Sequence, residues 1–441
     1  MKIKKILLLS VLSSLTTSAL ALDIPLSSTN KEASDNTVFK LEGLFNFQGG
    51  YASNKNIVNQ DMVVLDDKVD VSAKGGRKRV KFYSESYFAA SLRKQADELA
   101  YGAKIVLVPT AKIKTSPSLN GSHIFLESEF GKVEIGSPYD AASKLRVTGC
   151  DVAAGSGDWS SYGSINDKAL NYNGLAPEFA DAEDYYQDVI FRSKLNQIND
   201  KAEPARKVSY YTPKMQGFQA GVSYTPDTGN TGGGALAASL SGLDEVAIKG
   251  TDNTYVFNKN AKDAVGGGLS YEHTITDGVD IKVAVTGEYG KSAGKLLVIE
   301  NKGQSTEKLL NSYKLSNLAT YNAGLTLNYG NFSYGASYGT LGKSLTSSEY
   351  NKTGRNTKYL NGAVAYGQGP IRTSISYFKS DQFKNTLNSV TLGSEYKLAP
   401  GLLPYGEISY FEAKGKPSFY PEAQKRKTRG TVAVLGAKLK F

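Results

Sequence analysis

Apolar and polar residues alternate in short segments from Thr37 to the C-terminus. The stretch from Tyr321 to Tyr329 shows the pattern most clearly, because Tyr, Ala and Leu occupy its odd positions while Asn, Gly and Thr occupy the even ones. A period of two predicts β-strands with one apolar face and one polar face. Sixteen segments follow it: 37–51, 79–91, 99–109, 121–130, 132–138, 206–213, 217–226, 264–275, 279–290, 318–329, 331–341, 358–367, 370–380, 389–398, 402–412 and 430–441.

The connections between these segments alternate in length. Short turns such as Gly131-Lys132 and Gly330-Asn331 alternate with long polar loops such as 227–263 and 291–317. This sorting, together with aromatic residues at the ends of many apolar faces, is typical of membrane barrels, whereas a soluble β-sandwich gives no reason for it. The sequence therefore predicts an all-β fold, a transmembrane antiparallel β-barrel of sixteen strands.

Two stretches complicate that count. The 52–78 stretch contains Val69, Val71 and Ala73 in alternation, so eighteen strands stay open as an alternative. The connection over 139–205 is far longer than an ordinary loop, and such loops are usually functional or disordered.

The N-terminus predicts export. Basic residues at positions 2, 4 and 5 precede an apolar stretch over 6–15, and Ala19-Leu20-Ala21 provides the small residues that a signal peptidase reads. The apolar stretch is much shorter than the roughly 20 residues of a membrane-spanning helix. We predict a signal peptide over 1–21, an N-terminal lead over 22–36 and a barrel over 37–441.

Composition narrows the class further. The mean hydropathy is -0.33, and 45 Gly and 28 Tyr against 3 Met and 1 Trp favour strands and tight turns. Cys150 is the single cysteine, which excludes an internal disulfide, and with His123 and His273 it makes too small a set for a zinc site. We therefore expect no cofactor and assign no metal site, and Ca²⁺ held by loop carboxylates stays open. The net charge of +10 comes from basic residues scattered among acidic ones, so we expect no nucleic-acid partner.

Two sequence features could indicate an enzyme, and neither is convincing. Residues 290–294 (GKSAG) match the nucleophile motif of hydrolases, but they follow an amphipathic strand and open a polar loop, whereas the chemistry needs a buried strand that leads into a helix. An outer-membrane phospholipase needs a histidine on the lipid-facing wall, and the alternation predicts that His123 faces the lumen. We predict that the chain is not an enzyme.

The last strand carries a candidate assembly signal. Ala433, Leu435, Ala437 and Leu439 share one face with Phe441, the C-terminal residue. A terminal aromatic after such a face resembles the signal that the barrel-assembly machinery recognises in outer-membrane proteins. We expect that machinery to be a partner and Phe441 to be the assembly signal.

Several patches resemble the general porins of Gram-negative bacteria, in particular those of α-proteobacterial type: 99–107 (LAYGAKIVL), 124–136 (IFLESEFGKVEIG), 155–159 (GSGDW), 208–227 (VSYYTPKMQGFQAGVSYTPD) and 398–411 (LAPGLLPYGEISYF). The resemblance implies a homotrimer in outer-membrane lipid and lipopolysaccharide, with the third extracellular loop folded into the lumen. It also implies passive diffusion of small hydrophilic solutes and ions through a water-filled pore. A surface-exposed structural or adhesin-type barrel with a blocked lumen is the alternative.

The resemblance also implies a constriction at which loop carboxylates face basic residues on the wall, so that a field across the pore sets the charge preference. Glu127, Glu129 and Glu134 are predicted on the lumen side, where many general porins place arginines, which leaves the ion selectivity open. The residues predicted to form the constriction are Lys40, Glu42, Arg79, Lys81, Glu85, Lys104, Glu127, Glu129, Asp140, Asp151 and Asp158.

Overall fold

The computed structural model describes residues 22–25, 37–57, 77–108, 118–155, 205–229, 243–247, 253–258, 260–276, 278–347, 356–382, 385–415 and 426–441. The predicted signal peptide, Asp158 and the 58–76 part of the possible extra strands lie outside these residues.

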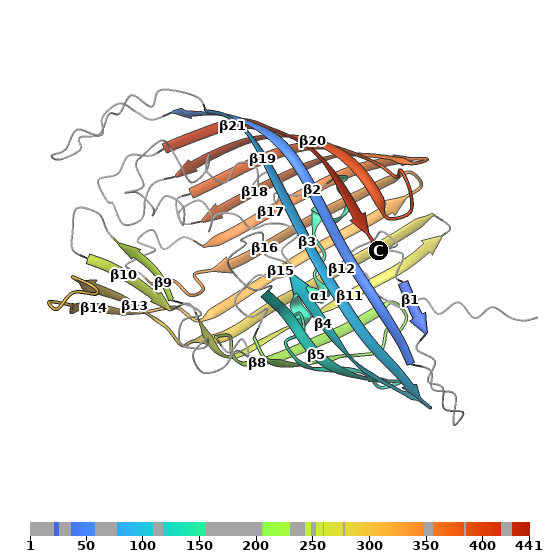
Figure 1. The fold of residues 1–441 in the computed structure, drawn as a ribbon, viewed down its shortest axis with the longest axis horizontal. Coiled ribbons are helices and arrows are strands. Elements are labelled where there is room, and N and C mark those ends of the chain that lie inside the picture. Colours follow the sequence, from blue (N-terminus) through green and yellow to red (C-terminus); the bar gives the residue numbers. More distant parts are fainter. Residues whose placement is uncertain are drawn as a thin grey trace, which may run out of the picture.

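A closed ring of antiparallel strands forms the body of the molecule (Figure 1). Each strand pairs with its neighbour along the chain, and the last pairs with the first, as sixteen predicted strands would. The ring consists of β2 (Thr37–Ile57), β3 (Arg77–Ala96), β4 (Leu99–Val108), β5 (Ser118–Ser128), β6 (Gly131–Gly136), β7 (Lys207–Tyr211), β8 (Phe218–Asp227), β11 (Ala261–Thr276), β12 (Val279–Ser292), β15 (Leu318–Tyr329), β16 (Phe332–Gly342), β17 (Thr357–Gln368), β18 (Ile371–Gln382), β19 (Asn385–Tyr396), β20 (Leu402–Gly415) and β21 (Arg426–Lys440).

Two pairings decide the strand number. β2 pairs directly with β3 from Thr37 to Asn54, which leaves no place in the ring for a further strand between them. β21 pairs with β2, and beyond it the Phe441 N–H donates to the Gly43 carbonyl at 3.2 Å. The barrel therefore has sixteen strands, and the eighteen-strand alternative is wrong.

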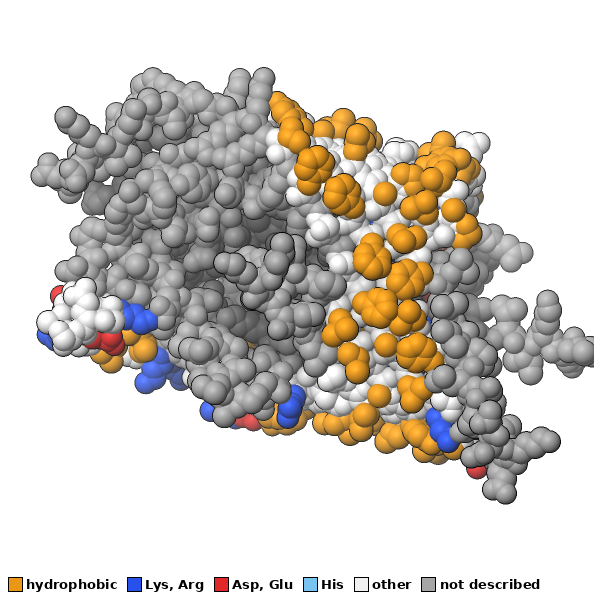
Figure 2. Space-filling model, viewed as in Figure 1, with side chains coloured by type: hydrophobic (Ala, Val, Ile, Leu, Met, Phe, Trp, Pro, Cys, Tyr) orange, Lys and Arg blue, Asp and Glu red, His pale blue; other side chains and the backbone are white. Residues whose placement is uncertain are grey.

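Along each strand, successive side chains alternate between the outer face of the barrel and its inner face. In β3, Val80 and Phe82 face outward and are among the most exposed apolar residues, and Leu435 in β21 is another. Figure 2 shows hydrophobic side chains gathered over the described strands of the face in view. Exposed apolar side chains at alternate positions around a closed barrel form the lipid-facing surface of an outer-membrane protein.

The two ends of the barrel differ. At one end the connections are tight turns, as at Gly330, whose positive φ of 54° lets β15 reverse into β16. Also at this end, the short strand β1 (Leu22–Pro25) pairs with residues 38–41 of β2, the part of that strand that extends past Phe441. We refer to this end as the short-turn end.

The opposite end carries a second sheet that the sequence analysis treats as polar loops. Strands β9 (Leu243–Ala247) and β10 (Asn253–Asn258) lie in the 227–263 connection, and β13 (Lys295–Glu300) and β14 (Lys308–Lys314) lie in the 291–317 connection. The order is β14-β13-β10-β9, so that β10 and β13 join the two connections (Figure 1). The apolar run Leu296 to Ile299 is the local signal for this sheet.

Helical structure among the described residues is limited to α1 (Ala141–Leu145) and a 3-10 turn, η1 (Gly149–Val152). Neither is long and apolar enough to cross a membrane. Both lie on the inner side of the barrel wall, and together they position the site described next.

Candidate functional site

The third long connection enters the barrel because two strands end early. β6 has 6 residues and β7 has 5, whereas β5 and β8 beside them have 11 and 10. The chain therefore leaves the wall partway along its height, where the Ser137 N–H donates to the Ser122 carbonyl at 2.8 Å. Figure 1 shows α1 inside the ring. We refer to residues 137–155 as the inward loop, and the prediction of an inward-folded third loop is confirmed.

The inward loop follows one side of the inner wall. α1 packs against β7, β8, β11 and β12, and η1 packs against β15, β16 and β17. Farther along, the Ala154 N–H donates to Ser374 on β18 at 2.8 Å, and the Gly155 N–H donates to Glu395 on β19 at 3.0 Å. We call β7 to β19 the covered wall and β2 to β6 the open wall.

Glycines on the inner face of the covered wall let the loop backbone approach. A Cβ at Gly324 on β15 would overlap the Val147 carbonyl, and one at Gly335 on β16 would overlap the Gly149 carbonyl. On β19, a Cβ at Gly393 would lie 2.9 Å from the Ala154 carbonyl oxygen. Larger residues at these positions would push the loop toward the lumen, so the glycines determine how close it lies to the wall.

Neutral polar side chains hold the loop backbone on the covered wall. The Gly149 N–H donates to Asn361 Oδ1 at 2.8 Å and to Ser337 Oγ at 3.1 Å, and Asn322 Nδ2 donates to the Val147 carbonyl at 3.3 Å. Buried backbone groups outside regular structure need such partners. These contacts give the loop a defined path although it contains little regular structure.

A buried lysine holds the two ends of the long connection together. Lys207 Nζ donates to the Pro138 carbonyl at 2.9 Å and to the Ala205 carbonyl at 2.7 Å. Its positive charge also acts on Asp140, which accepts from the Ala142 N–H at 2.8 Å as the N-cap of α1. Burial raises the pKa of the Asp140 carboxyl, and the Ala142 N–H and the Lys207 charge oppose that rise.

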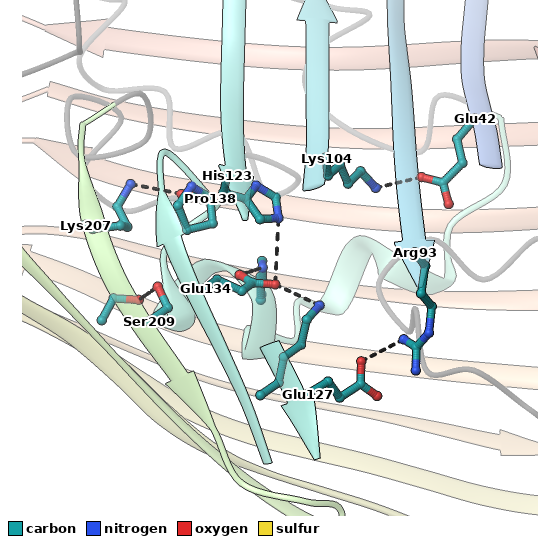
Figure 3. A network of polar contacts seen from close by, with 12 residues as sticks. Glu42, Arg93, Lys104, His123, Glu127, Glu134, Pro138, Lys207 and Ser209 are labelled. Carbon is teal, nitrogen blue, oxygen red and sulfur yellow. Dashed lines mark hydrogen bonds and ion pairs between the residues drawn. The ribbon is translucent and has the colours of Figure 1, made fainter. Parts of the chain in front are cut away.

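Charged side chains line the open wall instead. Glu42 on β2 accepts from Lys40 at 2.9 Å and from Lys104 on β4 at 2.7 Å. Register places Lys40 opposite Ser91 on β3, Ser91 opposite Lys104, and Lys104 opposite His123 on β5, so these residues form one row across the inner face. Figure 3 shows Lys104 pointing toward Glu42.

A second carboxylate lies at the border between the two walls. Glu134 on β6 is buried and pairs with Lys132 at 2.9 Å and with Lys144 of α1, while His123 Nε2 lies 3.9 Å from its Oε1. Figure 3 shows these contacts converging on Glu134. Because Lys144 belongs to the inward loop, Glu134 ties the start of that loop to the barrel wall.

The predicted constriction residues fall into several groups. Lys40, Glu42 and Lys104 lie together on the open wall, and register places Arg79, Lys81 and Glu85 on the same inner face, although their side chains lie outside the described part of the chain. Glu127 pairs with Arg93 at 2.8 Å close to the short-turn end. Two placements differ from the expectation: Glu129 lies in the exposed turn after β5, and Asp140 is buried as the N-cap of α1. Asp151 caps η1 by accepting from the Thr148 N–H at 2.8 Å and is exposed.

Asp151 of η1 and Lys104 of the open wall lie on opposite sides of the barrel. Counting along the paired strands, β16 lies eight places from β4 in the ring of sixteen, so η1 with the exposed Asp151 lies across from Lys104. The described residues contain no group of three or more His, Cys, Asp or Glu side chains that could hold a metal ion.

Three lysines that contribute to the site are absent from the residues predicted for it: Lys132, Lys144 and Lys207. Lys132 shares a strand face with Glu134 two residues on, so the alternation itself could have indicated it. Lys144 and Lys207 carry no such signal, because Glu134, the partner of Lys144, is 10 residues away along the chain, and Pro138, which Lys207 joins to the other end of the connection, is 69 residues away.

Known proteins resemble this chain at two levels. A family described as Gram-negative porin matches residues 9–416. An uncharacterized protein of Rickettsia felis is 48% identical and one of Rickettsia conorii is 49% identical, each covering 99% of this chain and 100% of its own length. Among solved structures, an anion-selective porin from Comamonas acidovorans superposes with a TM-score of 0.51 at 13% identity, over 92% of this chain and 100% of that chain, which is a likeness of fold.

Proposed function

Because the chain belongs to the Gram-negative porin family and forms an outer-membrane barrel, we propose that it is a water-filled channel for passive diffusion of small hydrophilic solutes and ions. A surface-exposed structural or adhesin-type barrel with a blocked lumen is the competing function. The two differ in whether water and solutes reach the inner face.

The partial exposure of the open-wall lysines is the observation that carries the proposal. Lys40 and Lys104 face the inside of a closed ring, yet 31% and 24% of their side-chain surface is exposed. An ammonium group without access to water in a membrane protein is costly, so the exposure favours a hydrated lumen. A blocked lumen would leave no water at these positions.

We propose that the constriction lies at the level of the inward loop, between that loop and the open wall. Lys104 with Arg79 and Lys81 would form one side, and Asp151 with Asp158 the other. Charges of opposite sign across a narrow aqueous space orient passing solutes. Asp151 lies across the ring from Lys104, which supports this arrangement; Asp158 and the side chains of Arg79 and Lys81 enter it from sequence and register.

The family resemblance further suggests a homotrimer surrounded by lipid and lipopolysaccharide, inserted by the barrel-assembly machinery. For the last step we propose Phe441 as the signal. Its ring lies 6.0 Å from that of Phe45 on the outer face, next to the junction of the last and first strands. Deleting Phe441 should lower the amount of heat-modifiable barrel in outer membranes under low expression, and an unchanged amount would contradict this role.

Planar-bilayer recording tests the channel proposal most directly. Protein purified in its heat-modifiable form should produce stepwise conductance increases, in groups of three if the trimer inserts as a unit. Boiled protein is the matched control and should produce none. Folded protein that inserts into the bilayer without conducting would refute the channel and favour the blocked barrel.

A further inference from the structure

The charges of the open wall are not balanced. Glu42 is shared by Lys40 and Lys104, and Glu134 is shared by Lys132 and Lys144. Four ammonium groups therefore meet two carboxylates along this side of the lumen. The surplus is two positive charges among the described members of these two clusters.

The ammonium groups and the carboxylates of these two clusters differ more in solvent exposure than in number. The lysine side chains are 24% to 35% exposed, whereas Glu42 is 17% exposed and Glu134 only 2%. Each carboxylate thus lies behind the ammonium groups that it binds. A solute in the lumen approaches the ammonium groups first, because the carboxylates are largely screened from it.

Among the described residues, the carboxylates of the covered wall do not offset this surplus of positive charge. Its carboxylate Glu288 is buried, and Glu395 is 13% exposed and lies 3.6 Å from Lys438; Glu407 on the adjacent strand β20 is buried as well. Several groups oppose the trend. Glu272 on β11 of the covered wall is 41% exposed and pairs at 2.9 Å with Lys214, which is 33% exposed. Asp151 is exposed on the inward loop, and the pair of Arg93 and Glu127 near the short-turn end exposes both signs about equally, at 42% and 40%.

From this distribution we infer that the pore prefers anions and that Lys40, Lys104 and Lys132 of the open wall, with Lys144 of the inward loop, are the groups that attract them. The inference rests on the proposed channel function. Small anions would exchange their hydration for ammonium contacts along the row, and cations would be repelled from the same side. Because the groups are in contact with water, the preference is electrostatic and should weaken with salt.

Reversal potentials across a KCl gradient measure this preference. At about 0.1 M salt, where the Debye length is about 10 Å, the wild-type channel should favour chloride over potassium by about threefold. K40Q/K104Q should bring that ratio close to one, and E42Q should raise it by removing the carboxylate that both lysines share. K308Q, in the external strand β14, is the matched control and should leave the ratio unchanged.

The outcomes separate the two proposals. A folded barrel without conductance refutes the channel itself. Conductance with a preference for potassium, or a chloride preference that K40Q/K104Q leaves intact, refutes the role of the lysines while the channel stands. If the double variant yields no heat-modifiable barrel, K132Q tests the same idea on the neighbouring pair, and an unchanged ratio there refutes it equally.

Discussion

The two sides of the lumen differ in their side chains and in what those side chains contact: the covered wall contacts the inward loop, and the open wall contacts water. The covered wall presents glycine, serine and asparagine to the inward loop and binds much of its backbone through neutral hydrogen bonds, whereas Lys207, Arg372 and Glu395 bind the backbone toward its two ends. The open wall presents lysine and glutamate to water. Small neutral groups allow close packing without the cost of burying charge, whereas long charged groups keep their heads hydrated and act on solutes. The inner face of one barrel thus contains both a support and a candidate selectivity surface.

Among substitutions that test the difference between the two walls, one at the border between them should change the stability of the barrel most. Lys207 is buried at the covered wall, and its loss removes a donor from two carbonyls and the stronger of the two lysine charges that act on Asp140. K207M should therefore destabilise the barrel by about 4 kcal/mol, as expected when one partner of a buried charged contact is removed. Denaturant unfolding in detergent micelles measures the change.

The control for K207M is K214M. Lys214 pairs with Glu272 at 2.9 Å, but both side chains are well exposed, so the loss should stay below about 1 kcal/mol. Equal effects of the two substitutions would mean that Lys207 does not anchor the long connection.

Filling the contact between loop and covered wall should have the next largest effect. G324V adds a side chain where the Val147 carbonyl lies, so the inward loop must move toward the lumen. We expect about 3 kcal/mol of destabilisation, typical of severe overpacking, and an altered single-channel conductance. G367V adds a Cβ whose nearest neighbour is 3.9 Å away and should change neither property. Wild-type conductance in folded G324V would show that the loop does not define the pore.

Weakening the tie between the loop and the open wall should cost less. E134Q removes the negative charge that binds Lys132 and Lys144, but both lysines are partly exposed and can be hydrated. We expect a loss of about 2 kcal/mol, together with more frequent current fluctuations as α1 loosens. Noise analysis of single channels gives the second readout, and a quiet trace with full stability would argue against the tie.

The smallest effect should come from the exposed pair near the short-turn end. E127Q removes the partner of Arg93, and because both side chains are about two-fifths exposed, the change in stability should be about 0.5 kcal/mol or less. E127Q thus serves as the exposed counterpart of E134Q. If E127Q destabilised the barrel as much as E134Q, burial would not distinguish the two glutamates.

Much of the architecture could be predicted from alternation alone. All sixteen ring strands correspond to predicted segments, although β2 and β3 extend several residues farther than expected. The sheet of β9, β10, β13 and β14 was missed because its central pairing joins two separate connections, from Asn253 with Glu300 to Phe257 with Leu296. Short strands whose partners lie in another loop leave no long periodic pattern in the chain.

For the candidate site, the face of each residue was predictable but its partners were not. Lys40, Glu42 and Lys104 were expected on the inner wall, and register places them there. Asp140 was expected to face the lumen, but within the inward loop it is buried as the cap of α1, because a helix N-terminus offers a carboxylate its backbone N–H groups. Nothing in the local sequence indicates that Lys144 would reach Glu134.

The sequence by itself determined which face of each strand meets lipid and which connection is long enough to enter the ring, and it left the choice between sixteen and eighteen strands to the structure. Because each strand has one face toward lipid and one toward water, apolar and polar residues alternate within the sequence of every strand, and the pattern can be recognised strand by strand. Only the tertiary structure decided the path of the inward loop, the pairing of Glu134 with two lysines and the exposure of ammonium groups over carboxylates. Those features depend on residues brought together when the barrel closes, and their distances across the lumen are independent of their separation along the chain.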